Sequence, residues 1–157
     1  MKNLIIIRHG KATHELMPDR ERFLTEKGIK RVRKHAEILK EKNIFPDLIV
    51  SSPAVRAYET AKIIAKTLNY NNANIVINEY FYFESMQTVV NHLGQLPNDA
   101  TTVFIVGHNN LWTDLANALS SKDIWHLRTA GIFGVQLDTN DWAEIFTTNQ
   151  SDLLLIN

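Results

Sequence analysis

Short apolar runs alternate with longer segments of helical periodicity along most of this chain. The first run, residues 4–7, is continuous rather than alternating, which is typical of a parallel strand covered on both faces. Apolar runs bounded by turn residues predict three further strands, at residues 46–52, 74–78 and 101–108.

Between these runs, apolar residues recur every three or four positions and predict helices. The first predicted helix, residues 24–43, has Thr25 as its N-cap. The second has Ser52 as N-cap and Pro53 at its first helical position. The remaining two predicted helices are residues 85–96, capped by Ser85, and residues 109–120.

The pattern changes near the end of the chain. Segments 131–138 and 142–148 lie on either side of the turn sequence TND, which predicts a terminal antiparallel hairpin. Strands that alternate with helices imply a parallel sheet with right-handed crossovers. We therefore expect a three-layer α/β sandwich with a mostly parallel sheet, formed by a single domain over residues 1–157. No repeat or Pro/Gly-rich linker divides the chain.

Polar residues follow the predicted strands where each strand ends. Arg8 and His9 end the first strand and His108 ends the fourth. Just beyond the second lie Ser51, Ser52 and Arg56, and Glu79 follows the third. Ligands bind beyond the carboxyl ends of strands in open parallel sheets, so we expect these residues at one shared rim.

Composition narrows the choice of partner. With 17 Lys+Arg against 17 Asp+Glu, the chain has no net field that would attract nucleic acid or a membrane surface. The absence of cysteine excludes disulfides, thiol catalysis and cysteine-based zinc sites. The basic residues Lys30, Arg31, Arg33 and Lys34 are interpreted as a solvated helix face. With no secretion or membrane signal, we expect a cytosolic protein.

Two arginines and two histidines without a matching set of carboxylates indicate an anion pocket. Guanidinium forks fit phosphate oxygens, and the first turn of a helix, where Arg56 is expected, also favours an anion. Gly10 and Gly107, which flank the histidines, would let the backbone approach a ligand. A neutral imidazole can attack phosphorus, and nearby arginines disfavour its protonation.

Four segments resemble the histidine phosphatase superfamily, also called phosphoglycerate mutase-like. They are RHG after the first strand, SSPAVRAYETA at the second helix, VGHNN after the fourth strand, and DRERFLTEKG before the first helix. The last of these is similar to small SixA-type phosphohistidine phosphatases. The resemblance covers roughly Asn3 to Leu119 and fades in the terminal hairpin.

This resemblance implies a role for each matching residue. His9 would be the phosphorylated nucleophile, and Arg8, Arg56 and His108 would surround the phosphoryl group. The backbone N–H of Asn109 could add a donor. No cofactor or metal is implied, and the partner would be a phosphorylated protein or a small phosphorylated metabolite.

The general acid is less clearly indicated. The family often places a glutamate after the third strand, and Glu79 has that position, but FYFES replaces the glycine-containing stretch that follows in the family. Asp19 and Glu15, in the loop after the first strand, are rivals, as is Glu84.

The short connection before the fourth strand bears on the substrate. Larger relatives carry a capping insertion there. In this chain only about twenty residues separate Glu79 from the fourth predicted strand. An open site favours phosphohistidine on a protein as the substrate. A small phosphomonoester substrate and a catalytically weak phosphate-binding module remain alternatives.

Other chemistries fit the sequence less well. A metal site at His9 and His108 lacks H-x-H or H-E-x-x-H spacing, and two arginines would repel a divalent cation. A serine nucleophile at Ser51 or Ser52 lacks the G-x-S-x-G elbow. Packing in the core or in the terminal hairpin is expected for the three tryptophans, which are Trp112, Trp125 and Trp142.

Overall fold

A computed structural model describes all 157 residues. The strands are β1 (Lys2–Arg8), β2 (Leu48–Ser51), β3 (Val76–Ile77), β4 (Thr102–Gly107), β5 (Ile132–Leu137) and β6 (Gln150–Ile156). The helices are α1 (Glu26–Glu41), α2 (Val55–Thr67), α3 (Met86–Leu93) and α4 (Leu111–Leu119), with short 3-10 turns η1 (Asp19–Glu21), η2 (Asn72–Asn74), η3 (Glu79–Phe81) and η4 (Trp142–Glu144). None of the helices has the length and hydrophobicity needed to cross a membrane.

All six strands form one sheet in the order β3-β2-β4-β1-β5-β6. β1, β2, β3 and β4 pair in parallel, whereas β5 runs antiparallel to both β1 and β6. The predicted α/β class, with a mostly parallel sheet and a C-terminal antiparallel hairpin, is therefore confirmed.

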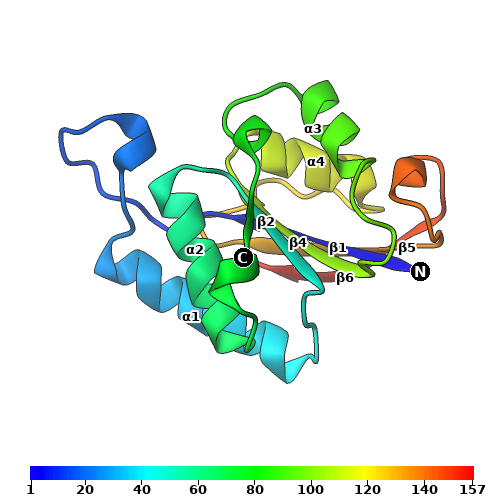
Figure 1. Cartoon of the computed structure of the whole chain (residues 1–157), viewed down its shortest axis with the longest axis horizontal. Coiled ribbons are helices and arrows are strands. Elements are labelled where there is room, and N and C mark those ends of the chain that lie inside the picture. Colours follow the sequence, from blue (N-terminus) through cyan, green and yellow to red (C-terminus); the bar gives the residue numbers. More distant parts are fainter.

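Helices cover both faces of this sheet (Figure 1). Leu4 and Ile6 of β1 pack in a cluster with residues of α3 and α4, such as Trp112. Ile5 and Ile7 point to the other face and pack with residues of α1 and α2. All four side chains of the first apolar run are fully buried, which explains why that run does not alternate.

The start of α2 differs from the prediction. The helix begins at Val55 with Ala54 as its N-cap, so Ser52 and Pro53 lie outside it. The Ser52 hydroxyl instead lies 2.7 Å from Nε2 of His108 and accepts a hydrogen bond from the N–H of Ala54 at 3.3 Å. This tertiary contact with His108 replaces the predicted capping role.

The hairpin is present, but its second strand is not the predicted segment 142–148. That segment forms η4 and a turn, because Trp142 and Ile145 are both buried and the side chain of Asp141 caps the turn. The second strand is β6, which pairs with β5. Trp112 and Trp142 are core residues as expected, but Trp125 is 92% exposed, so that expectation was wrong.

A glycine in the first turn of α1 generates a stability prediction. Alanine normally favours a helix over glycine by about 1 kcal/mol. A Cβ at Gly28 would nevertheless lie 2.3 Å from the carbonyl oxygen of Lys11, a backbone atom that cannot move aside cheaply. We expect Gly28→Ala to lower the free energy of unfolding by about 1–3 kcal/mol in guanidinium denaturation. Gly94→Ala is the control, since its nearest neighbouring atom would be 3.6 Å away. A Gly28→Ala protein as stable as the Gly94→Ala protein would contradict this account.

Candidate active site

The two histidines that follow β1 and β4 meet at one end of the sheet. β1 and β4 are parallel neighbours with Arg8 paired to Gly107, so the residues that follow them emerge side by side. The backbone N–H of His9 donates to the carbonyl of Gly107 at 3.0 Å, and the imidazole rings of His9 and His108 lie 5.2 Å apart between centroids. Strand pairing therefore produces the predicted meeting of the two rings.

The glycines beside these histidines serve packing. A Cβ at Gly107 would lie 2.5 Å from the indole of Trp112, and one at Gly10 would lie 2.8 Å from a methyl group of Val32. That both glycines let the backbone approach a ligand stays a prediction, whereas their effect on packing is visible in the structure. Each leaves space for a neighbouring core side chain.

The ring of His9 is held in one tautomer by the backbone. Its Nδ1 lies 2.6 Å from the carbonyl oxygen of Gly10. A carbonyl can only accept a hydrogen bond, so Nδ1 carries the proton and Nε2 carries a free lone pair. Burial and, to a lesser degree, the charges of Arg56, Arg8 and Arg22 outweigh the opposing effect of the Gly10 carbonyl and lower the pKa of His9 to about 4. His9 is therefore an uncharged imidazole at neutral pH.

Arg56 supplies the most deeply buried charge of the site. It lies in the first turn of α2, as predicted, and is only 2% exposed. Its guanidinium donates to the backbone carbonyl of Asp19 at 2.7 Å and to the Asp19 carboxylate at 3.0 Å. The same group lies 3.4 Å from Nδ1 of His108.

His108 is also held as a neutral ring. A guanidinium can only donate, so the neighbouring Arg56 assigns an acceptor to Nδ1 of His108 and leaves the proton on Nε2, which donates to Ser52. Burial, together with the nearby His9 and Arg56, lowers the pKa of His108 to about 3. The positive charge of the site therefore lies on its arginines.

Arg8, at the end of β1, and Asn109, between β4 and α4, both contact the loop between α4 and β5. The guanidinium of Arg8 donates to the carbonyl of Leu127 at 3.0 Å, and its Nη1 lies 3.4 Å from Nε2 of His126. The amide of Asn109 donates to the same carbonyl, while its oxygen accepts from the N–H and hydroxyl of Thr113. The side chain of Asn109 is thus fixed, and its backbone N–H makes no hydrogen bond within the chain.

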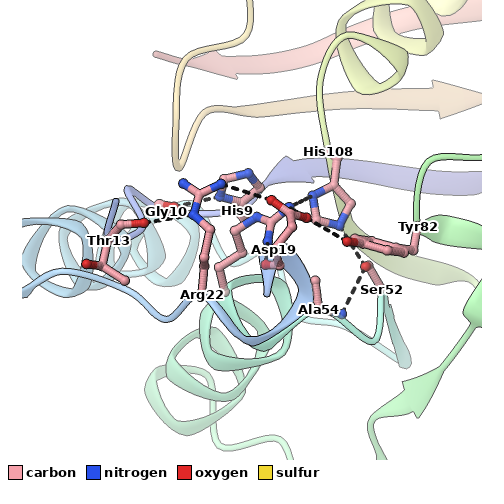
Figure 2. A network of polar contacts seen from close by, with 10 residues as sticks. His9, Gly10, Thr13, Asp19, Arg22, Ser52, Ala54, Tyr82 and His108 are labelled. Atoms are coloured by element: carbon pink, nitrogen blue, oxygen red, sulfur yellow. Dashed lines mark hydrogen bonds and ion pairs between the residues drawn. The ribbon is translucent and has the colours of Figure 1, made fainter. Parts of the chain in front are cut away.

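Asp19 contacts two arginines of the site, Arg56 and Arg22, which we call the arginine cluster (Figure 2). Besides its contacts with Arg56, its carboxylate accepts from Arg22 at 3.1 Å and from the hydroxyl of Tyr82 at 2.6 Å. Partial burial acts to raise the pKa of Asp19, but hydrogen bonds from Tyr82, Arg56 and Arg22 outweigh it and lower the pKa to about 2. The site therefore contains one ionised carboxylate, Asp19, which partly compensates the charge of its arginines.

The other acid candidates lie outside these contacts. Glu79 forms a two-pronged ion pair with Arg20, at 2.7 and 2.9 Å, and makes no hydrogen bond with the predicted phosphate-binding residues. Glu84 lines a small hollow with His108 and Asn109. Glu15 is exposed, and its carboxylate makes no hydrogen bond. Of the four candidates, Asp19 alone contacts the arginine cluster.

Sequence reasoning missed one guanidinium group of the site. Arg22 adds a third guanidinium, held by its Nε hydrogen bond to the carbonyl of Thr13 at 2.8 Å. Tyr82 and Phe83 place their rings 5.5 and 5.1 Å from the ring of His108, and Phe83 is 63% exposed. Arg22 was available as a signal, because it lies in the DRERFLTEKG segment three residues after Asp19.

Comparison with known sequences connects this geometry to a family. The sequence profile described as histidine phosphatase superfamily (branch 1) matches residues 4–80. An uncharacterized chloroplastic protein of Arabidopsis thaliana is 29% identical over 92% of this chain and 71% of its own length. The mitochondrial serine/threonine-protein phosphatase Pgam5 of Drosophila ananassae is 35% identical over 48% of this chain, which spans 26% of that relative.

Solved structures give the same fold. A SixA structure from Nakamurella multipartitia superposes with a TM-score of 0.87 at 18% identity, covering 99% of this chain and 95% of that one. The protein histidine phosphatase SixA complexed with tungstate gives 0.83 at 23% identity, covering 98% and 96%. A mycobacterial glucosyl-3-phosphoglycerate phosphatase gives 0.69 at 16% identity, covering 98% of each chain.

The electrostatics of His9 generate a pH prediction. We expect its ring resonances, identified by their loss in His9→Asn, to titrate in NMR spectra with a midpoint near pH 4. An unfolded histidine titrates at about pH 6.5. Between about pH 6.5 and pH 4 the unfolded chain therefore binds more protons than the folded protein. His9 should therefore lower the free energy of unfolding as the pH falls through this window, an effect absent from the variant. A His9 midpoint at the ordinary value would show that the ring is solvated and uninfluenced by the arginines.

Proposed function

This chain belongs to the histidine phosphatase superfamily, and we propose that it hydrolyses phosphohistidine on a protein substrate through a phosphorylated His9. One observation carries the proposal. The Nε2 lone pair of His9 is fixed by the hydrogen bond of Nδ1 to Gly10, within the field of three arginines. Family membership itself supports phosphatase activity, while the substrate and the covalent intermediate are the proposal.

The first step transfers the phosphoryl group to the protein. Nε2 of His9 attacks phosphorus, the bond from phosphorus to the leaving nitrogen or oxygen breaks, and the leaving group takes a proton. Arg8, Arg22 and Arg56 stabilise the negative charge on the transferring oxygens, and the free N–H of Asn109 adds a donor. Water then attacks the phosphorus of phosphohistidine, releasing phosphate and restoring neutral His9.

The proposed mechanism needs no metal ion. A divalent cation would assist by neutralising phosphate charge, and the arginines already supply that charge at fixed positions. Their own charge also opposes a second cation in the same pocket.

Asp19 is the proposed proton donor to the leaving group. In the free protein it is ionised, because Arg56, Arg22 and Tyr82 donate to its carboxylate. A bound phosphate competes for these guanidinium groups and places negative charge beside Asp19. Both changes raise the pKa of the Asp19 carboxyl, so substrate binding itself favours the protonated acid.

Two features support a protein substrate over a small ester. The chain from η3 to β4 contains one eight-residue helix, α3, and Phe83, two residues after η3, is exposed beside His108. The protein histidine phosphatase SixA has the same fold.

The small-phosphomonoester alternative is supported by the fold match to glucosyl-3-phosphoglycerate phosphatase. The weak phosphate-binding module is supported by the ionised state of Asp19 in the free protein.

A direct comparison of substrates tests the proposal. We expect faster turnover of a phosphohistidine-containing protein than of small phosphomonoesters such as p-nitrophenyl phosphate. Rapid quenching with labelled substrate should trap label on His9 that is stable in alkali and lost in acid, and His9→Asn should trap none. Faster turnover of the small esters would favour the metabolite phosphatase. Phosphate binding without turnover of any phosphoramidate or ester would favour the binding module.

The acid assignment is tested with Asp19→Asn, which keeps the shape of the side chain. We expect ester hydrolysis to fall by about a hundredfold, because general acid catalysis typically contributes at least that much. Phosphoramidate hydrolysis should fall less, since an imidazole leaves more readily than an alkoxide. Glu79→Gln is the matched control and should leave both rates close to wild type, because Glu79 contacts Arg20 instead. Similar losses on both substrates, or a comparable loss in Glu79→Gln, would remove Asp19 from this role.

A further inference from the structure

A second cluster of positive charge lies on α1, outside the candidate active site. Lys27, Lys30, Arg31 and Lys34 have the spacing that places side chains on one helix face. Together with His35 and Asn157 they line a hollow of about 410 Å³, and no apolar side chain contributes to its wall. The structure therefore shows a concave surface where the sequence indicated a flat solvated face. We call it the α1 groove.

No acidic side chain of the protein forms an ion pair with the cations of the α1 groove. All three ion pairs of the protein involve Asp19 or Glu79, and none involves a residue of α1. Arg31 donates from its Nη2 to the carbonyl of Asn157 at 3.0 Å, while its buried Nε makes no hydrogen bond. The protein as a whole has no net charge, so this positive field is local.

Hydrogen bonds join the α1 groove to the candidate active site. Nδ1 of His35, in the groove wall, donates to the carbonyl of Ala130 at 2.6 Å, and the N–H of Ala130 donates to the carbonyl of His9 at 2.9 Å. Asn157 donates to the carbonyl of His126, whose ring contacts Arg8. A ligand in the groove would therefore lie beside the loop that also borders the phosphate pocket.

We propose that the α1 groove binds an acidic segment of the phosphorylated protein substrate. The inference rests on the proposed action on a protein. The groove offers cations but no apolar wall for a nucleobase or an acyl chain. Lys27 and Lys34 lie roughly 10 Å apart along the helix axis, which an extended peptide covers in about three residues. Carboxylates on alternate residues of such a peptide would meet successive cations.

Two double variants with the same change of net charge separate this groove from general electrostatics. Lys30→Glu/Lys34→Glu reverses charge inside the groove, and Arg33→Glu/Lys40→Glu does so on the same helix but outside its wall. The probe is a fluorescein-labelled octaglutamate peptide, with octaglutamine and octauridylate as comparison probes, measured by fluorescence anisotropy. We expect the groove variant to bind octaglutamate about tenfold more weakly than wild type. The control variant should bind like wild type, and added salt should weaken binding.

Several outcomes would overturn the proposal. They are equal weakening in both variants, no binding of octaglutamate to wild type, equal binding of octaglutamine, and tighter binding of octauridylate, which would indicate a nucleic-acid surface.

Turnover measurements then distinguish failure of the groove from failure of the proposed function. The groove variant should keep wild-type kcat/KM on a small phosphoramidate, while its KM rises on a phosphohistidine protein with an acidic segment. If the wild type hydrolyses both substrates and this KM is unchanged, the groove proposal fails alone. If the wild type hydrolyses neither, the proposed function fails, and the peptide measurement still decides the groove.

Discussion

The ion pair between Arg56 and Asp19 is the interaction on which this end of the molecule depends. Arg56 is almost fully buried, and a buried charge without a partner is strongly destabilising. Asp19 meets it with both its carbonyl and its carboxylate. Because Asp19 lies in η1 and also binds Tyr82 near η3, the same ion pair fixes the segments that follow β1 and β3 against α2. The charge of Arg56, which is proposed to bind phosphate, therefore also positions the walls of the pocket.

In the proposed mechanism, the same carboxylate gives the pocket two states. Without a ligand, Asp19 compensates Arg56 and Arg22, which keeps several positive charges close together around an uncharged His9. A phosphate makes the same kinds of contact with guanidinium groups as a carboxylate does, with more charge and more oxygens. Binding is thus an exchange of one anion for another, and its net free energy is smaller than the contacts with phosphate alone would suggest. The proposed acid role of Asp19 follows from this exchange, because the displaced carboxyl would have a higher pKa beside the leaving group.

Much of this arrangement could be predicted because it depends on local patterns. The continuous apolar run of residues 4–7 indicates burial on both faces of β1. The parallel pairing of β1 with β4 then brings His9 and His108 together. The contributions of loops could not be predicted in the same way. Ser52 satisfies the rules for a helix cap, yet it binds His108, a residue from a distant segment. The choice between Asp19 and Glu79 depends on how η1 folds over α2, and periodicity contains no information about that path. The segment 142–148 has strand-like composition, but burial of Trp142 bends it into a turn.

His9, the proposed nucleophile, is positioned by backbone groups. The N–H of His9 bonds to Gly107, its carbonyl accepts from Ala130, and its ring bonds to Gly10, so strand and loop backbone hold it on three sides. The arginines set the charge around the ring without holding it in place. Beyond the arginines, the rim of the pocket includes the exposed ring of Phe83, and the connection to β4 contains only the short helix α3. An open, charged rim suits a phosphate carried on a large folded surface, because such a surface can exclude water as it docks, a role that a lid performs in enzymes for small substrates.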